Sequence, residues 1–106
     1  MIARIWKGKT KIEHAEAYTA FMKNRAVPDY EATEGFVKLI FLKRVDGDCA
    51  YFELITFWEH MEAIKNFAGD AVEKAKYYPE DKHFLLNFPE TVTHFDVFAE
   101  ECPTRS

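Results

Sequence analysis

The chain has 106 residues, the size of one domain, and 48% of them are hydrophobic, which is too apolar for a disordered chain. The formal net charge is −4 and the basic residues are scattered, which argues against nucleic-acid binding, because that affinity depends on neutralising phosphates. No apolar run approaches the roughly 20 residues of a membrane helix, and two cysteines are too few for a disulfide scaffold, so we expect a reducing cytoplasmic setting.

The first third of the chain predicts a strand and a helix. Residues 1–7 carry β-forming side chains and predict a strand that ends at Gly8. Thr10 and Glu13 form a capping-box pattern that opens a helix, and Pro28 is expected to stop it. The helix shows one stripe at three- and four-residue spacing: Ala15, Tyr18, Phe21, Met22 and Arg25.

A β-hairpin is predicted after a loop over residues 29–34. Residues 36–42 and 49–57 are rich in aromatic and β-branched side chains, and Asp46-Gly47 between them is a strong signal for a two-residue turn. Counting back from that turn places Val45 opposite Asp48. Both faces of the hairpin are then apolar: Val37, Leu39, Phe41, Phe52, Leu54 and Thr56 on one, and Phe36, Ile40, Leu42, Tyr51, Ile55 and Phe57 on the other.

The rest of the chain predicts helices and a last strand. An apolar face from Met61 to Ala68 indicates a helix that Gly69 ends. A second capping pattern at residues 70–73 predicts a short helix that ends at Pro79. Residues 84–88 are apolar but too short to assign, and residues 92–99 predict a strand.

The order β-α-β-β-α-(α)-β predicts an α+β, ferredoxin-like domain over residues 1–100, with an antiparallel sheet and a tail over residues 101–106. Helices cover only one face of such a sheet, whereas this hairpin is apolar on both faces. A second copy of the chain is the simplest cover for the other face, so we expect a homodimer through the sheets. The alternative is a long loop folded over the sheet.

Five segments carry a resemblance to a known family: residues 1–6, 27–30, 46–47, 57–59 and 77–81. They resemble an uncharacterised branch of the antibiotic biosynthesis monooxygenase superfamily, and the match spans nearly the whole chain. The resemblance implies a dimeric α/β-barrel with a pocket in each protomer between helices and sheet. It also implies an oxygenase of a small electron-rich aromatic or quinol that needs no cofactor and no metal. A non-enzymatic dimeric module that binds a small hydrophobic molecule is the alternative.

Haem degraders form another branch of that superfamily. Their pattern is a helix with a Trp, an iron-ligating His ten residues later, and an Asn near the end of the first strand. The matching positions here are Phe67, Tyr77 and Trp6-Lys7. Because all three positions depart from the pattern, we do not expect haem degradation.

Two polar side chains of the predicted sheet are the candidate catalytic residues. Arg4 lies in an apolar strand and could bind an anion, or could form a core or interface ion pair with Glu53 or Asp96. His94 could move a proton, or could be a hydrogen-bonded interface residue. Seven further side chains are candidates for substrate binding, although core packing or loop pinning would also explain them: Trp6, Tyr30, Trp58, Phe67, Tyr77, Tyr78 and His83.

Overall fold

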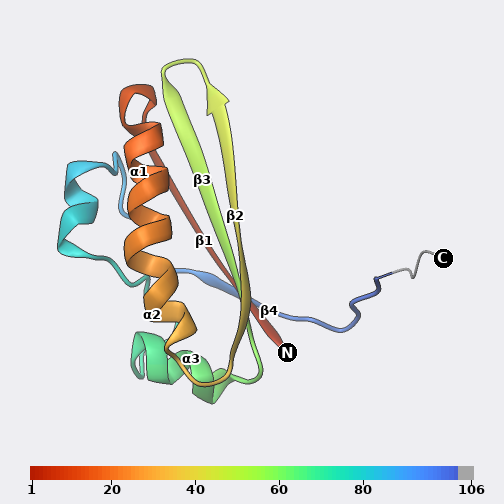
Figure 1. Ribbon diagram of the computed structural model, residues 1–106. Helices are drawn as coiled ribbons and strands as arrows, with labels where there is room; N and C mark the ends of the chain where they lie inside the picture. Colours follow the sequence, from red (N-terminus) through yellow and green to blue (C-terminus); the bar gives the residue numbers. More distant parts are fainter. Residues whose placement is uncertain (103–106) are drawn as a thin grey trace.

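The computed structural model describes residues 1–102 and forms a four-stranded antiparallel sheet with helices on one face (Figure 1). The strands are β1 (Ile2–Lys11), β2 (Phe36–Asp46), β3 (Cys49–Trp58) and β4 (Thr93–Asp96), in the spatial order β2-β3-β1-β4. The helices are α1 (Ala15–Phe21), α2 (Val27–Glu31) and α3 (Met61–Ala68). This is the predicted α+β, ferredoxin-like arrangement. The last four residues of the predicted tail lie outside the described part of the chain.

The first strand is longer than predicted and continues through Gly8 to Lys11. The capping box at Thr10 does not form, because the Thr10 hydroxyl donates to the Lys11 carbonyl instead. Thr10 stays in the ladder opposite Ala50 and is fully buried. The helix begins only after a short turn over residues Ile12–His14.

Pro28 does not end the first helix, contrary to the prediction. A wider π-helical turn over Met22–Ala26 joins α1 to α2, with the Val27 amide bonded to the Met22 carbonyl. Pro28 then occupies the first turn of α2, where its missing N–H group costs no hydrogen bond. The wider turn accommodates the proline, and a nearly continuous helical segment therefore crosses the sheet (Figure 1).

The hairpin turn lies one residue later than predicted. Asp46 pairs with Cys49 and Val45 with Ala50, so the two turn residues are Gly47 and Asp48. Gly47 has a φ of 62°, whereas no residue other than glycine has a positive φ in the described chain. A positive φ at the first turn residue alone is the requirement of a type II′ turn, which glycine meets here. The pairing differs from the predicted one by two residues. A shift of two residues does not change the face on which a side chain lies.

One irregularity in β2 changes the faces near its start. The register shifts between Phe36 and Lys38, so Phe36 pairs with Trp58 and packs edge-on against it on the helix side. Val37 is the extra residue of this bulge and is exposed. The prediction that placed Phe36 on the opposite face was wrong, because a bulge reverses the alternation beyond it.

The predicted helix over residues 70–78 does not form. The segment forms a turn instead, in which the Lys74 amide donates to the Ala71 carbonyl at 3.0 Å, and Lys74 bridges to Thr91. The Arg4 guanidinium donates to the carbonyls of Val72 and Lys74, at 2.6 and 2.9 Å, which are acceptors that a helix would use for itself. A short 3₁₀ turn over Pro79–His83 begins at the proline instead of ending there.

The core lies between the helices and the sheet, and alternate residues of β3 supply its floor. Its fully buried members include Trp58, Tyr18 and Ile64. The helix α3 and its glycine stop at Gly69 agree with the sequence prediction. Within residues 1–102 no helix is long and apolar enough to span a membrane.

Candidate functional site

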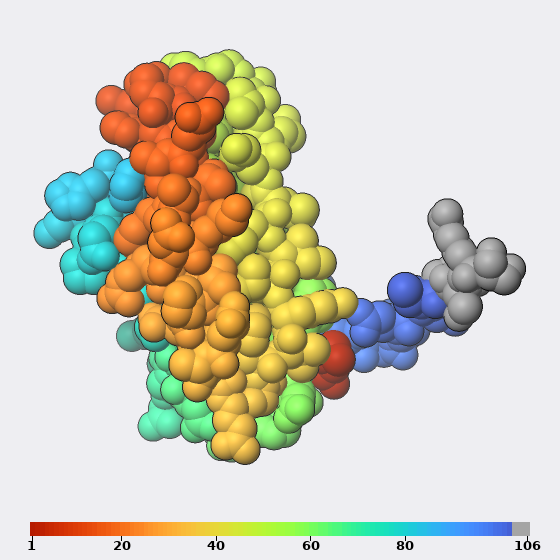
Figure 2. Space-filling model, in the orientation of Figure 1, coloured from red at the N-terminus to blue at the C-terminus, as the bar shows by residue number. Residues whose placement is uncertain are grey.

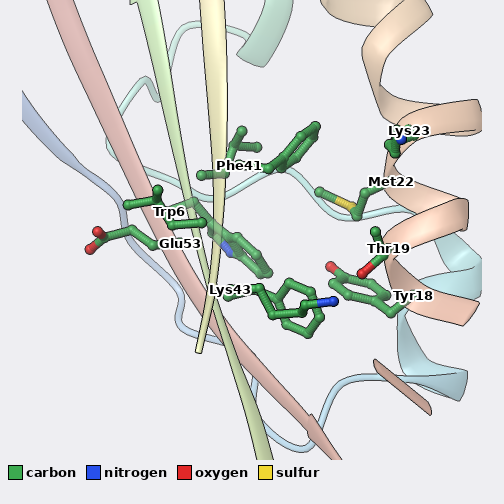
Figure 3. Close-up of a pocket in the computed structure, with 11 residues that line it drawn as sticks. Trp6, Tyr18, Thr19, Met22, Lys23, Phe41, Lys43 and Glu53 are labelled. Atoms are coloured by element: carbon green, nitrogen blue, oxygen red, sulfur yellow. The ribbon is translucent and has the colours of Figure 1, made fainter. Parts of the chain in front are cut away.

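A cavity of about 320 Å³, called the main cavity below, lies between α1 and the sheet (Figure 3). That volume falls in the range of small-molecule sites, which are concave and mostly apolar. It is lined by Trp6, Tyr18, Thr19, Met22, Lys23, Phe41, Leu42, Lys43, Phe52, Glu53 and Leu54.

The α1 segment supplies one wall of the cavity. Tyr18 and Met22 are four residues apart on the same side of the helix and both are buried. Thr19 and Lys23 have the same spacing and lie next to them at the more exposed edge. The predicted apolar stripe therefore faces partly into the core and partly into the cavity.

The sheet supplies the other wall through side chains of one face. In the pairing register Trp6 lies opposite Leu54, which lies opposite Phe41, and Phe52 lies opposite Lys43. All these positions share the helix side of the sheet, because side chains alternate along each strand. Figure 3 shows the Lys43 side chain extending from the sheet toward Tyr18, whereas the Glu53 carboxylate points away from α1.

The Trp6 indole is fixed at both ends. Its Nε1 donates to the Tyr77 hydroxyl at 3.1 Å, and that hydroxyl donates to the Pro89 carbonyl at 2.5 Å. The other end of the ring lies over Gly8, where an added Cβ would come within 3 Å of the indole. Only glycine leaves room for the indole at this position of β1, so the local sequence sets the shape of the cavity wall.

The hydroxyl of Tyr18 is hydrogen-bonded to a buried carboxyl group that does not line the cavity. The hydroxyl donates to Asp81 Oδ1 at 3.4 Å, and Asp81 Oδ2 accepts from the Tyr78 amide at 2.6 Å. Burial, and then the charge of Asp81, raise the pKa of Tyr18 well above its usual range. Burial also raises the pKa of Asp81, against the two hydrogen bonds that lower it. Tyr18 is therefore a protonated donor and not a base.

A second, much smaller cavity of about 30 Å³ lies behind Trp6. It has room for about one water molecule. Three of the predicted substrate-binding residues line it together with Trp6: Tyr30, Tyr77 and Tyr78. These tyrosines fill the space between the helices and the sheet, and Tyr78 is held by Asp29 through a hydrogen bond of 2.7 Å.

The other predicted substrate-binding residues lie elsewhere. Trp58 and Phe67 pack against Tyr30 in the core, with ring centroids 6.1 and 4.4 Å from the Tyr30 ring. His83 borders an open groove on the outer side of α1, with Phe21 and Phe84. The sequence thus identified one residue of the main cavity, Trp6, and its support, Tyr77.

Arg4 and His94 are brought together, but neither lines the main cavity. Arg4 is buried on the helix side of the sheet, opposite both Thr56 and His94. It has no carboxylate partner among the described residues, because Glu53 pairs with Lys7 at 3.5 Å and the Arg4 guanidinium bonds to backbone carbonyls. This arrangement ties β1 to the segment after α3.

Haem is the prosthetic group that the resemblance raises, and the residues present do not fit it. None of the four histidines lines the main cavity. Tyr18 is protonated and bonded to Asp81, so it is a poor source of a tyrosinate ligand. At the positions that match the haem pattern, Phe67 is a core residue and the Tyr77 hydroxyl is occupied by Trp6 and Pro89. Within residues 1–102 no cluster of three His, Cys, Asp or Glu side chains forms a metal site.

No family model and no curated protein matches the sequence. Several solved structures match the fold. The haem degrader MhuD of Mycobacterium tuberculosis, solved with two haems in its active site, gives a TM-score of 0.65 at 20% identity, over 96% of this chain and 100% of that chain. A proposed antibiotic biosynthesis monooxygenase of Bacillus cereus gives 0.62 at 18% identity, over 96% and 97%. A protein of unknown function from Nitrosomonas europaea gives 0.61 at 15%, over 98% and 95%.

The TM-scores show a shared fold. Identities this low leave the reaction open, because one fold serves many functions. The fold likeness agrees with the segments that carried the resemblance in the sequence, and it spans nearly the full length of each chain. The protein therefore shares the ferredoxin-like fold of these structures, one of which is a proposed antibiotic biosynthesis monooxygenase.

Proposed function

We propose that the protein is a cofactor-independent monooxygenase of a small electron-rich aromatic or quinol, which binds in the main cavity. The observation that carries the proposal is the cavity of about 320 Å³ whose wall is formed by the rings of Trp6, Tyr18, Phe41 and Phe52. Flat aromatic walls suit a flat aromatic ligand, because ring pairs add favourable contacts to the burial of apolar surface.

The reaction would balance without any added reductant. A quinol gives up two hydrogen atoms to dioxygen; one oxygen atom enters the ring and the other leaves as water. The substrate supplies the electrons, so the protein needs only to bind it, favour its anion and exclude bulk water. The polar tips of Trp6 and Tyr18 are bonded elsewhere, so the cavity presents their faces to a ligand.

Oxygen consumption with a panel of benzene- and naphthalene-diols tests the proposal. We expect uptake with a one-to-one ratio of dioxygen to oxygenated product. Thr19→Trp should abolish uptake by filling the cavity, whereas Ala20→Trp, on the exposed side of α1, should leave it intact. Uptake that is equal in the two variants, or absent with every diol, would overturn the proposal.

A binding module without chemistry is the second candidate. It is favoured by the absence of a base among the residues that line the cavity, since Tyr18 is held protonated and Glu53 points away. The same panel separates the two: a module binds the diols, as seen in quenching of Trp fluorescence, and consumes no oxygen.

We further propose that the protein works as a homodimer that buries the open face of the sheet. All helices lie on the other face (Figure 1), and the open face carries exposed apolar side chains. Ile40, Leu42, Tyr51 and Phe95 are among them. An apolar sheet face of this kind is typical of an interface.

A further inference from the structure

The mouth of the main cavity carries an unbalanced positive charge. Three of the residues that line it have charged side chains: Lys23, Lys43 and Glu53. The Glu53 carboxylate is directed away from the helix side of the sheet (Figure 3) and forms an ion pair with Lys7, 3.5 Å away. Its negative charge is thus compensated elsewhere, and the two lysines are the charges that face the cavity.

Neither lysine has an acidic neighbour that could neutralise it. On the helical segment, the residues three and four positions from Lys23 are Thr19, Ala20, Ala26 and Val27. On the sheet, Lys43 lies opposite Phe52 of β3, and its neighbours on the same face of β2 are Phe41 and Val45. No ion pair within residues 1–102 involves either ammonium group.

The lysines approach the cavity from opposite walls. Lys23 comes from the helical segment, and Lys43 reaches across from β2 toward Tyr18 (Figure 3). The floor between them is apolar, made by Trp6, Phe52 and Leu54. A low-dielectric wall strengthens the field of a nearby charge, so an anionic group at this mouth is stabilised more than it would be on an open surface.

We propose that the cavity selects amphipathic anions: a flat apolar body of one or two rings with a single anionic oxygen group, a carboxylate or an ionised phenol, held between Lys23 and Lys43. This inference rests on the proposed use of the same cavity and names its substrate class. The ring body lies against Trp6, and the charge stays near the solvent. For a phenolic substrate, the positive field of the two lysines favours the electron-rich anion. This compensates for the absence of a base among the residues that line the cavity.

Titration calorimetry with two matched probes tests the inference: 1-naphthoate, which is anionic, and 1-naphthamide, which has nearly the same shape and no charge. We expect naphthoate to bind about tenfold more tightly, with the advantage lost in high salt, because a charged hydrogen bond exceeds a neutral one and is screened when exposed. Lys23→Met and Lys43→Met should each reduce the preference and together remove it, while naphthamide binding persists. Lys65→Met, on α3 outside the cavity, should retain the preference.

A preference that survives in the double variant, equal affinity for the two probes, or no binding of either would overturn the inference. The proposed reaction has a separate outcome. If naphthoate binds with the expected preference and no diol consumes oxygen, the selectivity stands and the monooxygenase proposal fails. If neutral diols are oxygenated and naphthoate gains no advantage, the reaction stands and the selectivity fails. Melting temperatures near that of the wild type show that the variants are folded.

Discussion

Arg4 Nη1 lies 3.3 Å from His94 Nε2, across the pairing of the first and last strands. Two basic side chains can approach this closely when the imidazole is neutral and accepts a hydrogen bond from the guanidinium. Burial, followed by the charge of Arg4, lowers the pKa of His94, which agrees with a neutral ring. The pair therefore acts as a donor and an acceptor, and Arg4 continues to the carbonyls of Val72 and Lys74.

Arg4→Met tests whether this arrangement is structural. Each hydrogen bond from a charged donor is worth roughly 1.5–3 kcal/mol, so loss of both carbonyl contacts should lower the unfolding free energy by about 3–6 kcal/mol. Urea unfolding measures this loss. Arg44→Met removes an exposed arginine from β2 and should cost little. If Arg4 serves the ligand, as the sequence also allowed, Arg4→Met will unfold like the wild type but will not bind diols.

His94 should make stability depend on pH in a defined direction. Its pKa is lowered by folding, so between the ordinary value of about 6.5 and the lower folded value the unfolded chain binds the proton more readily. The stabilising contribution is therefore present above that ordinary pKa and is lost as the pH falls toward the folded value. Urea unfolding at pH 5.5 and 7.5 should show a larger loss for the wild type than for His94→Gln. His83→Gln, at an exposed position, should behave like the wild type. If His94→Gln lost as much stability between pH 7.5 and pH 5.5 as the wild type, the pH dependence would not come from His94.

Tyr77→Phe should loosen the cavity wall without emptying it. The change removes the acceptor for Trp6 Nε1 and the donor to the Pro89 carbonyl, and each lost hydrogen bond costs about 1 kcal/mol. The Trp emission spectrum should change, and diol affinity should fall because the indole is no longer fixed. Tyr51→Phe, an exposed tyrosine of β3 outside the main cavity, serves as control. Unchanged emission and affinity in Tyr77→Phe would show that Gly8 and the core alone position the indole.

The sequence predicted the antiparallel sheet and α3, because these depend on the alternation of side chains along a strand and on the hydrophobic face of a helix. It missed the π-helical turn before Pro28, since a proline indicates a helix end unless the turn before it widens. It also predicted a helix over residues 70–78 that Arg4 prevents by binding carbonyls from a distant strand. Such long-range competition leaves no trace in local propensity.

The candidate site was only partly predictable for a related reason. Tyr18 and Met22 were placed correctly on an apolar stripe, but periodicity does not distinguish a stripe that meets the core from one that lines a cavity. Lys23 and Lys43 carry no motif at all. Their relation exists only because the hairpin puts Lys43 on the helix side of the sheet and α1 packs over that face, which no local pattern in the sequence indicates.

The proposed dimer makes the last prediction. Three isoleucines lie side by side across three strands on the open face: Ile40, Ile55 and Ile5. The Ile40 residue is 41% exposed. Ile40→Asp would place a charge in the middle of the sheet-to-sheet contact, where it would be buried without a partner, and that is costly. Light scattering should therefore give twice the mass of one chain for the wild type and a single chain for Ile40→Asp. Val45→Asp, near the hairpin end and 54% exposed, should stay dimeric. A monomeric wild type at micromolar concentration, or an Ile40→Asp variant that remains a dimer, would mean that the open face has another cover.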